Sequence, residues 1–209
     1  MHERTSEPAS QRRVASIATL RRAARTCRAC PLWKPATQTV FGEGPQHARI
    51  VLIGEQAGDR EDVEGTPFVG PAGRVLDQAL DEIGVARTSL YVTNVVKHFK
   101  FELRGKRRLH KRANAAEIAA CTSEWLDREL VSVAPRYVVC LGALASRVMF
   151  GASFKLQRGR GVWQRVAPDR WCLATVHPSF VLRSRIGGGY ESAYRGFVSD
   201  LARLAELPD

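Results

Sequence analysis

The stretch between residues 50 and 62 constrains the fold of this chain more than any other. Residues 50–53 are four consecutive aliphatic residues, a pattern typical of a strand buried on both faces of a parallel sheet. Gly54 ends this run, and the segment after it is rich in acidic and amide side chains: Glu55, Gln56, Asp59, Glu61 and Asp62. Ligands of open α/β sheets bind outside the carboxyl ends of the strands, so this segment predicts a functional cleft. This stretch alone leaves an acidic surface loop open as the alternative.

Composition favours a single domain with a polyanionic partner. The 209 residues, of which 44% are hydrophobic, can bury one full core, and no linker-like segment divides them. The 32 Lys and Arg residues outnumber the 21 Asp and Glu residues and give a formal net charge of +11, which makes nucleic acid the expected partner. No apolar run is long enough for a membrane span or the core of a signal peptide, so we expect a cytoplasmic protein.

Hydrophobic periodicity predicts strands that alternate with helices. We expect disorder in residues 1–10, an irregular connection over 33–44, a turn-rich segment over 65–73 and a hairpin over 154–166. The periodicity predicts helices over 11–26, 74–83, 115–132, 142–150 and 190–206, and strands over 50–53, 90–96, 137–141 and 171–176. This alternation implies one α/β domain, a doubly wound three-layer α/β/α sandwich with a mostly parallel central sheet.

The steepest concentration of charge lies between residues 97 and 112. Eight Lys or Arg residues stand there against the single Glu102, interleaved with Phe99 and Phe101 and divided by Gly105. Such a mixture suits a mobile loop on a nucleic-acid backbone, while a solvated face of the protein is the alternative.

The five cysteines argue against a disulfide framework in an intracellular chain. Cys27 and Cys30 form a C-x-x-C pair, which by itself fits half a metal site, a redox pair or coincidence. Cys121 lies in a predicted helix, whereas Cys140 and Cys172 lie in predicted core strands and are most simply packed residues.

Two more strands end in polar side chains. Asn94 lies near the end of the second predicted strand, and His177 follows the last one. Either residue alone is equally compatible with a hydrogen-bonded turn, so neither identifies a site by itself.

The motifs taken together resemble a known family. Their order is G-E-Q-A-G-D-R-E-D, then G-T-P-F-V-G-P-A-G, then Y-V-T-N-V-V-K, then H-P-S-F-V-L-R. This order resembles the uracil-DNA glycosylase superfamily, specifically its iron–sulfur family 4 and the X-type branch, UdgX. The resemblance extends from about Cys27 to the C-terminal helix. The resemblance implies the fold of these enzymes for residues 11–209.

Two features resemble the X-type branch more than family 4. Family 4 enzymes have a cysteine directly after the V-K of the third motif, whereas His98 and a longer basic segment follow it here. That segment contains K-R-R-L-H, from Lys106 to His110, which resembles the loop whose histidine becomes covalently attached to DNA in the X-type branch. In the first motif, Ala57 replaces the usual proline of the family, which removes a constraint on the backbone.

The resemblance implies a role for each site residue. Cleavage of the deoxyuridine bond develops positive charge on the sugar and negative charge on uracil, so the site needs opposed stabilising groups. Glu55, Gln56 and Asp59 would lie near the sugar, His177 near the uracil oxygen, and His110 would capture the sugar. Gly54, Phe68 and Asn94 would hold the base, and the DNA backbone would be bound by Lys106, Arg107, Arg108, Ser179 and Arg183.

The resemblance also implies a metal site. The positions that match the four cysteines of family 4 are Cys27, Cys30, His98 and Cys121. This set suits a 4Fe-4S cluster with an imidazole ligand, and structural zinc is the alternative. We assign the cluster a structural role, in which it fastens the N-terminal helix and the base of the basic segment to the sheet.

Three functions follow as hypotheses. The first is excision of uracil from DNA, with single strands preferred, by a monomer that captures the sugar on His110. The second is an ordinary multiple-turnover uracil-DNA glycosylase that releases a free abasic site. The third is a non-catalytic iron–sulfur module that binds DNA lesions, although such a module has no need of the polar set at the strand ends.

Overall fold

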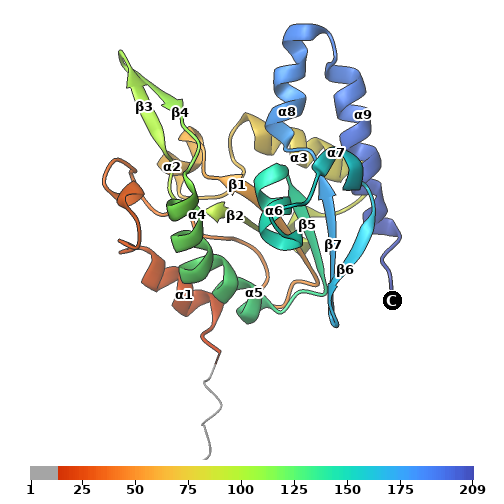
Figure 1. The fold of residues 1–209 in the computed structure, drawn as a ribbon, viewed down its shortest axis with the longest axis horizontal. Coiled ribbons are helices and arrows are strands. Elements are labelled where there is room, and N and C mark those ends of the chain that lie inside the picture. The colour runs from red at the N-terminus through yellow and green to blue at the C-terminus, as the bar shows by residue number, and fades with distance from the viewer. Residues whose placement is uncertain (1–13) are drawn as a thin grey trace, which may run out of the picture.

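A five-stranded sheet forms the centre of the molecule (Figure 1). The computed structural model describes residues 14–209, so the disorder predicted for residues 1–10 lies outside the described part. The strands in spatial order are β2 (Tyr91–Val96), β1 (Ile50–Gln56), β5 (Tyr137–Leu141), β7 (Arg170–Thr175) and β6 (Trp163–Ala167). All neighbours pair in parallel except β6 and β7. The predicted single-domain α/β fold with a mostly parallel sheet is confirmed.

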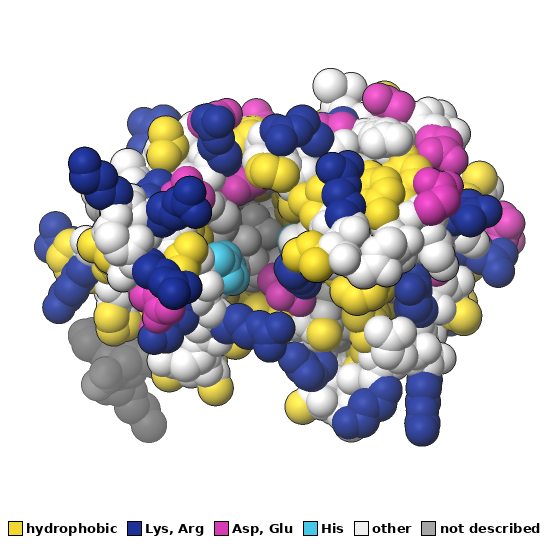
Figure 2. All heavy atoms as spheres, turned by 90° about the horizontal axis from the view of Figure 1, so that it is seen from above, with side chains coloured by type: hydrophobic (Ala, Val, Ile, Leu, Met, Phe, Trp, Pro, Cys, Tyr) yellow, Lys and Arg dark blue, Asp and Glu magenta, His cyan; other side chains and the backbone are white. Residues whose placement is uncertain are grey.

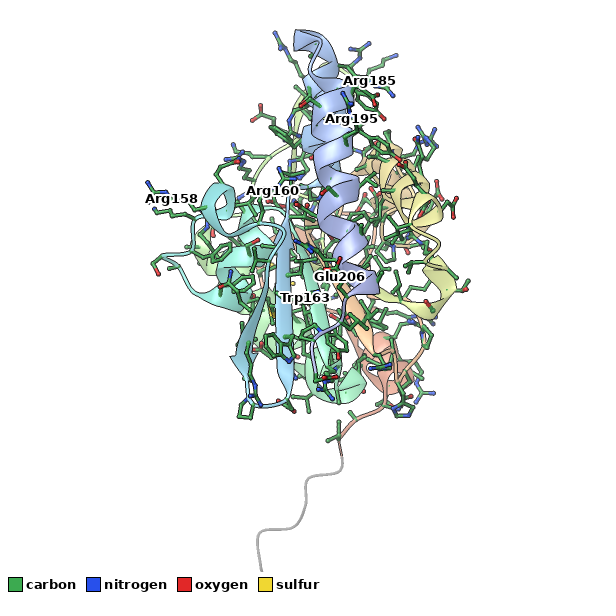
Figure 3. All side chains as sticks on the ribbon, turned by 90° about the vertical axis from the view of Figure 1, so that its right-hand side faces the viewer. Arg158, Arg160, Trp163, Arg185, Arg195 and Glu206 are labelled. Carbon is green, nitrogen blue, oxygen red and sulfur yellow. The ribbon has the colours of Figure 1, made fainter. Side chains whose placement is uncertain are left out.

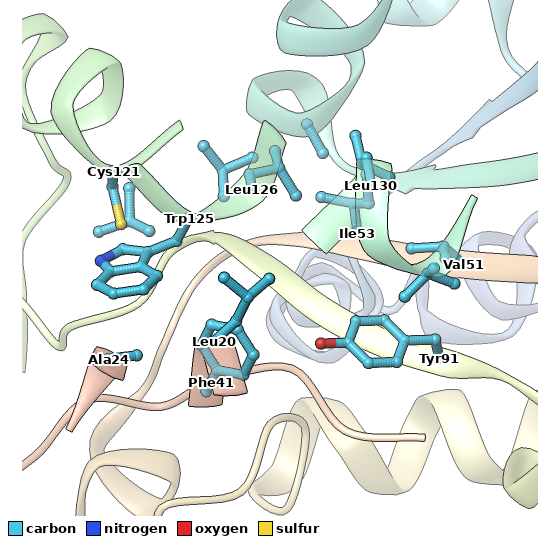
Figure 4. Close-up of a cluster of buried hydrophobic side chains, with 14 of the residues drawn as sticks. Leu20, Ala24, Phe41, Val51, Ile53, Tyr91, Cys121, Trp125, Leu126 and Leu130 are labelled. Carbon is cyan, nitrogen blue, oxygen red and sulfur yellow. The ribbon is translucent and has the colours of Figure 1, made fainter. Parts of the chain in front are cut away.

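Helices cover both faces of this sheet. One face packs against α1 (Ile17–Ala24), α4 (Ala115–Cys121), α5 (Asp127–Val133) and α6 (Ala143–Phe150). The other packs against α3 (Pro71–Glu82), α8 (Pro178–Arg183) and α9 (Tyr190–Leu201). In the first core, Trp125 lies beside Cys121 and near Leu20 and Phe41 (Figure 4). The buried strands have continuous apolar runs because helices cover them on both sides.

Two predicted boundaries differ from the structure at the site. Strand β1 does not end at Gly54 but continues through Gln56, which places Glu55 and Gln56 on the strand itself. The acidic segment beyond it is a short helix, α2 (Asp59–Glu64), with three acidic side chains in its first turn. Acidic side chains stabilise the positive end of a helix, which explains why this segment is helical.

The prediction of a hairpin over 154–166 is wrong. Part of that segment forms a short helix, α7 (Leu156–Gly159), and the rest begins β6, which pairs with β7 instead. The turn between these strands falls at Pro168 and Asp169, residues that favour turns.

The basic segment is an ordered hairpin rather than a loop. Strands β3 (Phe101–Arg104) and β4 (Arg107–His110) pair in antiparallel register, and Gly105 lies in the turn with φ +60°. Figure 1 shows this hairpin projecting from the body of the molecule, opposite α8 and α9.

Short irregular helices complete the chain. The helix predicted over 115–132 is interrupted by a π-helical turn, and the helix predicted over 190–206 ends in a 3-10 turn. The π-helical turn is η3 (Thr122–Leu126), and the 3-10 turn at the end is η5 (Ala202–Ala205). Three further 3-10 turns are η1 (Pro31–Trp33), η2 (Arg87–Ser89) and η4 (Ser184–Gly187). Among residues 14–209, every helix is too short or too polar to cross a bilayer.

Candidate functional site

A cleft of about 900 Å³ opens where the parallel strands end. Figure 2 shows this hollow with a histidine on its wall and with Lys and Arg side chains around its rim. Nine of the predicted site residues line it: Glu55, Gln56, Asp59, Phe68, Asn94, His110, His177, Ser179 and Arg183. The cleft therefore gathers residues from β1, β2, β4 and α8, which lie far apart in the sequence.

The floor of the cleft is lined by Asn94 and Phe68, and Gly54 lies against both side chains; all three residues are buried. A Cβ atom at Gly54 would lie 2.2 Å from Asn94 Oδ1 and 2.4 Å from Phe68 Cζ, so only glycine permits this approach. Phe68 has φ +56°, a strained value for an aromatic residue and one that often marks a functional site. Asn94 Oδ1 has no hydrogen-bond partner, which leaves a buried acceptor available for a ligand.

Glu55 lies at the N-terminus of α6. Its Oε1 accepts a hydrogen bond of 3.2 Å from the backbone N–H of Leu144. The helix dipole there favours a carboxylate. Gly142, with φ +102°, makes room for it, because a Cβ at this position would lie 2.5 Å from Glu55 Oε1. This contribution of the α6 N-terminus was not predicted from the sequence, although Gly142 directly follows the apolar strand β5 as Gly54 follows the apolar run 50–53.

The hydrogen bonds of His177 define its tautomer. Its Nδ1 accepts the backbone N–H of Ser179 at 3.1 Å and lies 2.8 Å from Ser179 Oγ, which in turn accepts from Arg183 Nη1 at 2.9 Å. Because a backbone N–H can only donate, Nδ1 of the neutral ring must be unprotonated, and Nε2 carries the proton. Burial lowers the pKa of His177 to about 4, against the opposing effect of Glu55 and with help from Arg183. His177 is therefore a neutral donor at physiological pH.

His110 reaches the cleft from the end of the hairpin. It pairs with Phe101 across the hairpin, and its ring centroid lies 5.9 Å from that of Phe99. The side chain is open to the cleft, but partial burial by the cleft walls lowers its pKa below the ordinary value, with Glu55 opposing. A neutral imidazole has a lone pair that is free to act as a nucleophile.

Gln56 holds the chain that leaves the hairpin. Its Oε1 accepts the backbone N–H of Ala113 at 3.1 Å, and its Nε2 lies 3.5 Å from Lys111 O. Gln56 thus supports the segment next to His110, in addition to lining the cleft.

Arg108 anchors the hairpin to α2. Its guanidinium forms ion pairs of 2.7 Å with Asp59 Oδ1 and 2.6 Å with Asp62 Oδ2, and it lies over the rings of Phe99 and Phe101. Asp62 is fully buried and also accepts from Thr37. These contacts occupy a side chain that the sequence analysis predicted to bind DNA, and Asp62 was missed as its partner.

Exposed basic side chains lie on both sides of the cleft. Lys106 and Arg107 are exposed at the turn of the hairpin, outside the cleft lining. On the other side, Arg183 of α8 lines the cleft, while Arg185 and Arg195 lie beyond it, near the tip formed by η4 and α9 (Figure 3). A groove with cations on both rims suits a polyanionic strand.

The four predicted metal ligands lie on the first core. Cys27, Cys30, His98 and Cys121 are all buried, and the pKa of Cys121 is raised to about 11 by burial. Cys27 Sγ accepts the indole N–H of Trp125 at 3.0 Å, and Cys121 Sγ accepts the backbone N–H of Lys97 at 3.2 Å. Hydrogen bonds to sulfur of this kind tune iron–sulfur clusters. In residues 14–209, however, no three such side chains converge closely enough to hold a single metal ion.

The tautomer of His98 follows from Thr39. The Thr39 hydroxyl donates its only hydrogen to Ala24 O at 2.7 Å, so the 3.0 Å contact with His98 Nε2 requires Nε2 to be the donor. Nδ1 of His98 is then unprotonated in the neutral ring. Metal-bound histidines commonly donate their other N–H in this way, so the residue fits a ligand role.

Comparison with known proteins places the chain in a family. The family model of the uracil DNA glycosylase superfamily matches residues 41–202. A type-4 uracil-DNA glycosylase of Archaeoglobus fulgidus is 35% identical over 81% of this chain and 85% of its own length. A type-4 uracil-DNA glycosylase of Thermotoga maritima is 35% identical over 77% of this chain and 80% of its own length. The chain therefore belongs to the uracil-DNA glycosylase superfamily.

Proposed function

We propose that this protein is a uracil-DNA glycosylase that excises uracil and joins the resulting sugar to His110, as in the X-type branch. The observation that carries the proposal is the cleft itself, whose lining includes His110 as well as Glu55 and His177. A multiple-turnover enzyme needs the last two residues but has no need of a histidine nucleophile beside them.

The base enters the cleft flipped out of the DNA. Its face stacks on Phe68, and its N3–H meets the unpartnered Oδ1 of Asn94. The energy of unstacking, a few kcal/mol, is offset by contacts of the basic rims with phosphates. Unpaired uracil requires less of it, so single-stranded DNA is the preferred substrate in this proposal.

Bond cleavage uses opposed charges. As the bond between C1′ and N1 breaks, uracil leaves with the electron pair, and the Nε2–H of His177 donates to its charged oxygen. The carboxylates of Glu55 and Asp59 stabilise the cationic sugar from the other side. A neutral donor suits this step because it adds no positive charge beside the carboxylate of Glu55.

His110 then captures the cationic sugar within the same cleft. An unprotonated ring nitrogen of His110 bonds C1′, and the ring then loses the proton of its other nitrogen to solvent, while uracil gains one. A nucleophile held beside the cation has a large advantage over free water. The product is a protein–DNA adduct, so the enzyme completes one turnover.

Denaturing electrophoresis with uracil-containing single-stranded DNA tests the proposal. We expect a shifted band that survives heat and detergent, together with free uracil. Free uracil with an abasic strand and no shifted band would support instead an ordinary glycosylase, the activity for which the type-4 relatives are named. The absence of free uracil under every condition would contradict both and favour a lesion-binding module.

The proposed cofactor is a 4Fe-4S cluster held by Cys27, Cys30, His98 and Cys121. A cluster of this kind takes one protein ligand for each iron, and three thiols and one imidazole would provide the four that it needs. When bound, it would supply a rigid cross-link between α1, β2 and α4. Purified protein should contain iron and sulfide, and a colourless protein with zinc alone would overturn the assignment.

A further inference from the structure

A buried ion pair lies beneath the uracil pocket and is not used by the reaction described above. Lys97 and Glu129 join the end of β2 to α5, and their side chains are 0% and 1% exposed. A buried pair of this kind is weak evidence for stability, because apolar residues of similar volume often stabilise a protein as well. Its position therefore calls for another explanation.

All three donors of the Lys97 ammonium are used. Nζ donates to Glu129 Oε2, to Thr93 Oγ1 at 2.6 Å and to the backbone carbonyl of Asn94 at 2.7 Å. The other carboxylate oxygen, Glu129 Oε1, accepts from the hydroxyl of Tyr91 at 2.7 Å. The network thus contacts Tyr91, Thr93 and Asn94, three residues of the strand that carries the base-reading amide.

Strand β2 is the edge of the sheet, so its outer side has no neighbouring strand. There, Val92 forms a bridge with Glu43, and the backbone N–H of Val40 donates to Lys97 O. Between these two points, the carbonyl of Asn94 bonds to Lys97 Nζ. The ammonium thus donates to the Asn94 carbonyl the hydrogen bond that a backbone N–H of a sixth strand would otherwise donate.

The side chain of Asn94 depends on this backbone support. Its Oδ1 is buried without a protein partner, so no hydrogen bond of that atom fixes the amide before the base arrives. Van der Waals contact with the neighbouring residues and the position of the backbone determine where the amide points. A shift of the backbone would transfer directly to the base-reading group.

We propose that Lys97 and Glu129 are positioning residues that fix Asn94 for recognition of the uracil edge. The inference rests on the proposed function. In this view, the pair contributes to selectivity and rate through Asn94, and its contribution disappears when the Asn94 amide is absent.

A double-mutant cycle on single-turnover uracil release tests this inference. Lys97→Met with Glu129→Gln removes both charges and so avoids an unpaired buried charge. In the presence of Asn94 we expect this pair variant to reduce the rate by about 10- to 100-fold, as misplacement of a substrate contact does. In the Asn94→Ala background we expect a further loss of less than about twofold.

Leu130→Ala is the matched control. Leu130 is the next residue on α5, is buried, and belongs to the first core without bonding to the pair. Its loss should destabilise the fold, as thermal unfolding will report, and change the rate by the same factor with and without Asn94. If the pair variant does not fold, Lys97→Gln with Glu129→Gln, which also leaves no unpaired charge and keeps polar side chains beside Thr93 and Tyr91, enters the same cycle.

Equal losses for the pair variant in both backgrounds would overturn the inference and reduce the pair to a structural element. A parent protein that releases no uracil would contradict the proposed function instead. In that case the side-chain amide signals of Asn94 in NMR spectra decide the inference: they should shift in the pair variant and stay unchanged in Leu130→Ala. Asn94 amide signals that stay unchanged in the pair variant, or that shift equally in Leu130→Ala, would overturn the inference.

Discussion

A single added methyl group at position 54 should abolish uracil recognition. The Cβ of Gly54→Ala would lie within 2.4 Å of the side chains of Asn94 and Phe68, and both are buried and unable to retreat easily. We expect loss of uracil excision with DNA affinity preserved, because phosphate contacts supply most of the affinity and base contacts the selection. Gly187→Ala, where a Cβ meets nothing within 4 Å, is the control for an added methyl. Normal excision by Gly54→Ala would remove these residues from the pocket.

The rate of bond cleavage should tolerate mild acid. The pKa of His177 lies near 4, below its ordinary value of 6.5, so the ring stays neutral until the pH approaches 4. The single-turnover rate of uracil release should therefore remain level from neutral pH to about pH 5 and fall below it, since protonation of Nδ1 would disrupt the bond from Ser179. The same profile in His110→Ser would exclude His110 as its source. A decline centred near pH 6.5 would mean that His177 titrates normally.

Residue types alone predicted several side chains that the structure brings together in one cleft. Glu55, Asn94 and His177 were found because polar side chains at the ends of apolar strands stand out in the sequence. Their partners were not found, since the hydrogen bonds from Leu144 and Ser179 come from the backbone and have no signature in side-chain chemistry. Ala57, the departure from the family's proline, donates its N–H to Val96 O at 3.2 Å, a bond that proline cannot make.

The hairpin is the element in which two adjacent arginines should behave differently. Arg107→Ala should weaken DNA binding and reduce its salt dependence by about one unit of log–log slope, because one phosphate is no longer neutralised. Arg108→Ala should leave that slope unchanged and reduce capture on His110, because it releases the hairpin from Asp59 and Asp62. Binding titrations at several salt concentrations and the yield of adduct separate the two effects. A change in slope for Arg108→Ala alone would reverse these roles.

The local sequence shows the high positive charge of this segment, but it could not predict that the segment forms a hairpin. Charge and a central glycine are as typical of a loop as of two short strands, and the ordering contacts come from distant residues such as Asp62 and Thr37. The apolar strands were predicted well, because burial on both faces dictates their composition. The hairpin predicted over 154–166 was wrong because β6 pairs with β7, a strand that lies outside that segment.

On the scale of the whole molecule, the sheet brings two walls together around one cleft. His110 at the end of the hairpin lines one wall of the cleft and residues of α8, among them Ser179 and Arg183, line the other. The hairpin and α8 project on opposite sides of the sheet (Figure 1). The first core, with the proposed cluster ligands, lies under the hairpin, while the Lys97 and Glu129 pair connects that side to the base pocket. Preference for single strands, a monomeric state and a cytoplasmic location remain predictions.

The number of uracil molecules released per enzyme molecule tests the account most directly. The parent protein should stop near one, because each turnover consumes His110. His110→Ser should exceed one and leave free abasic DNA without an adduct, since the groups that cleave the bond remain and water replaces the missing nucleophile. A stable adduct with His110→Ser, or continued release by the parent without any adduct, would contradict capture on His110.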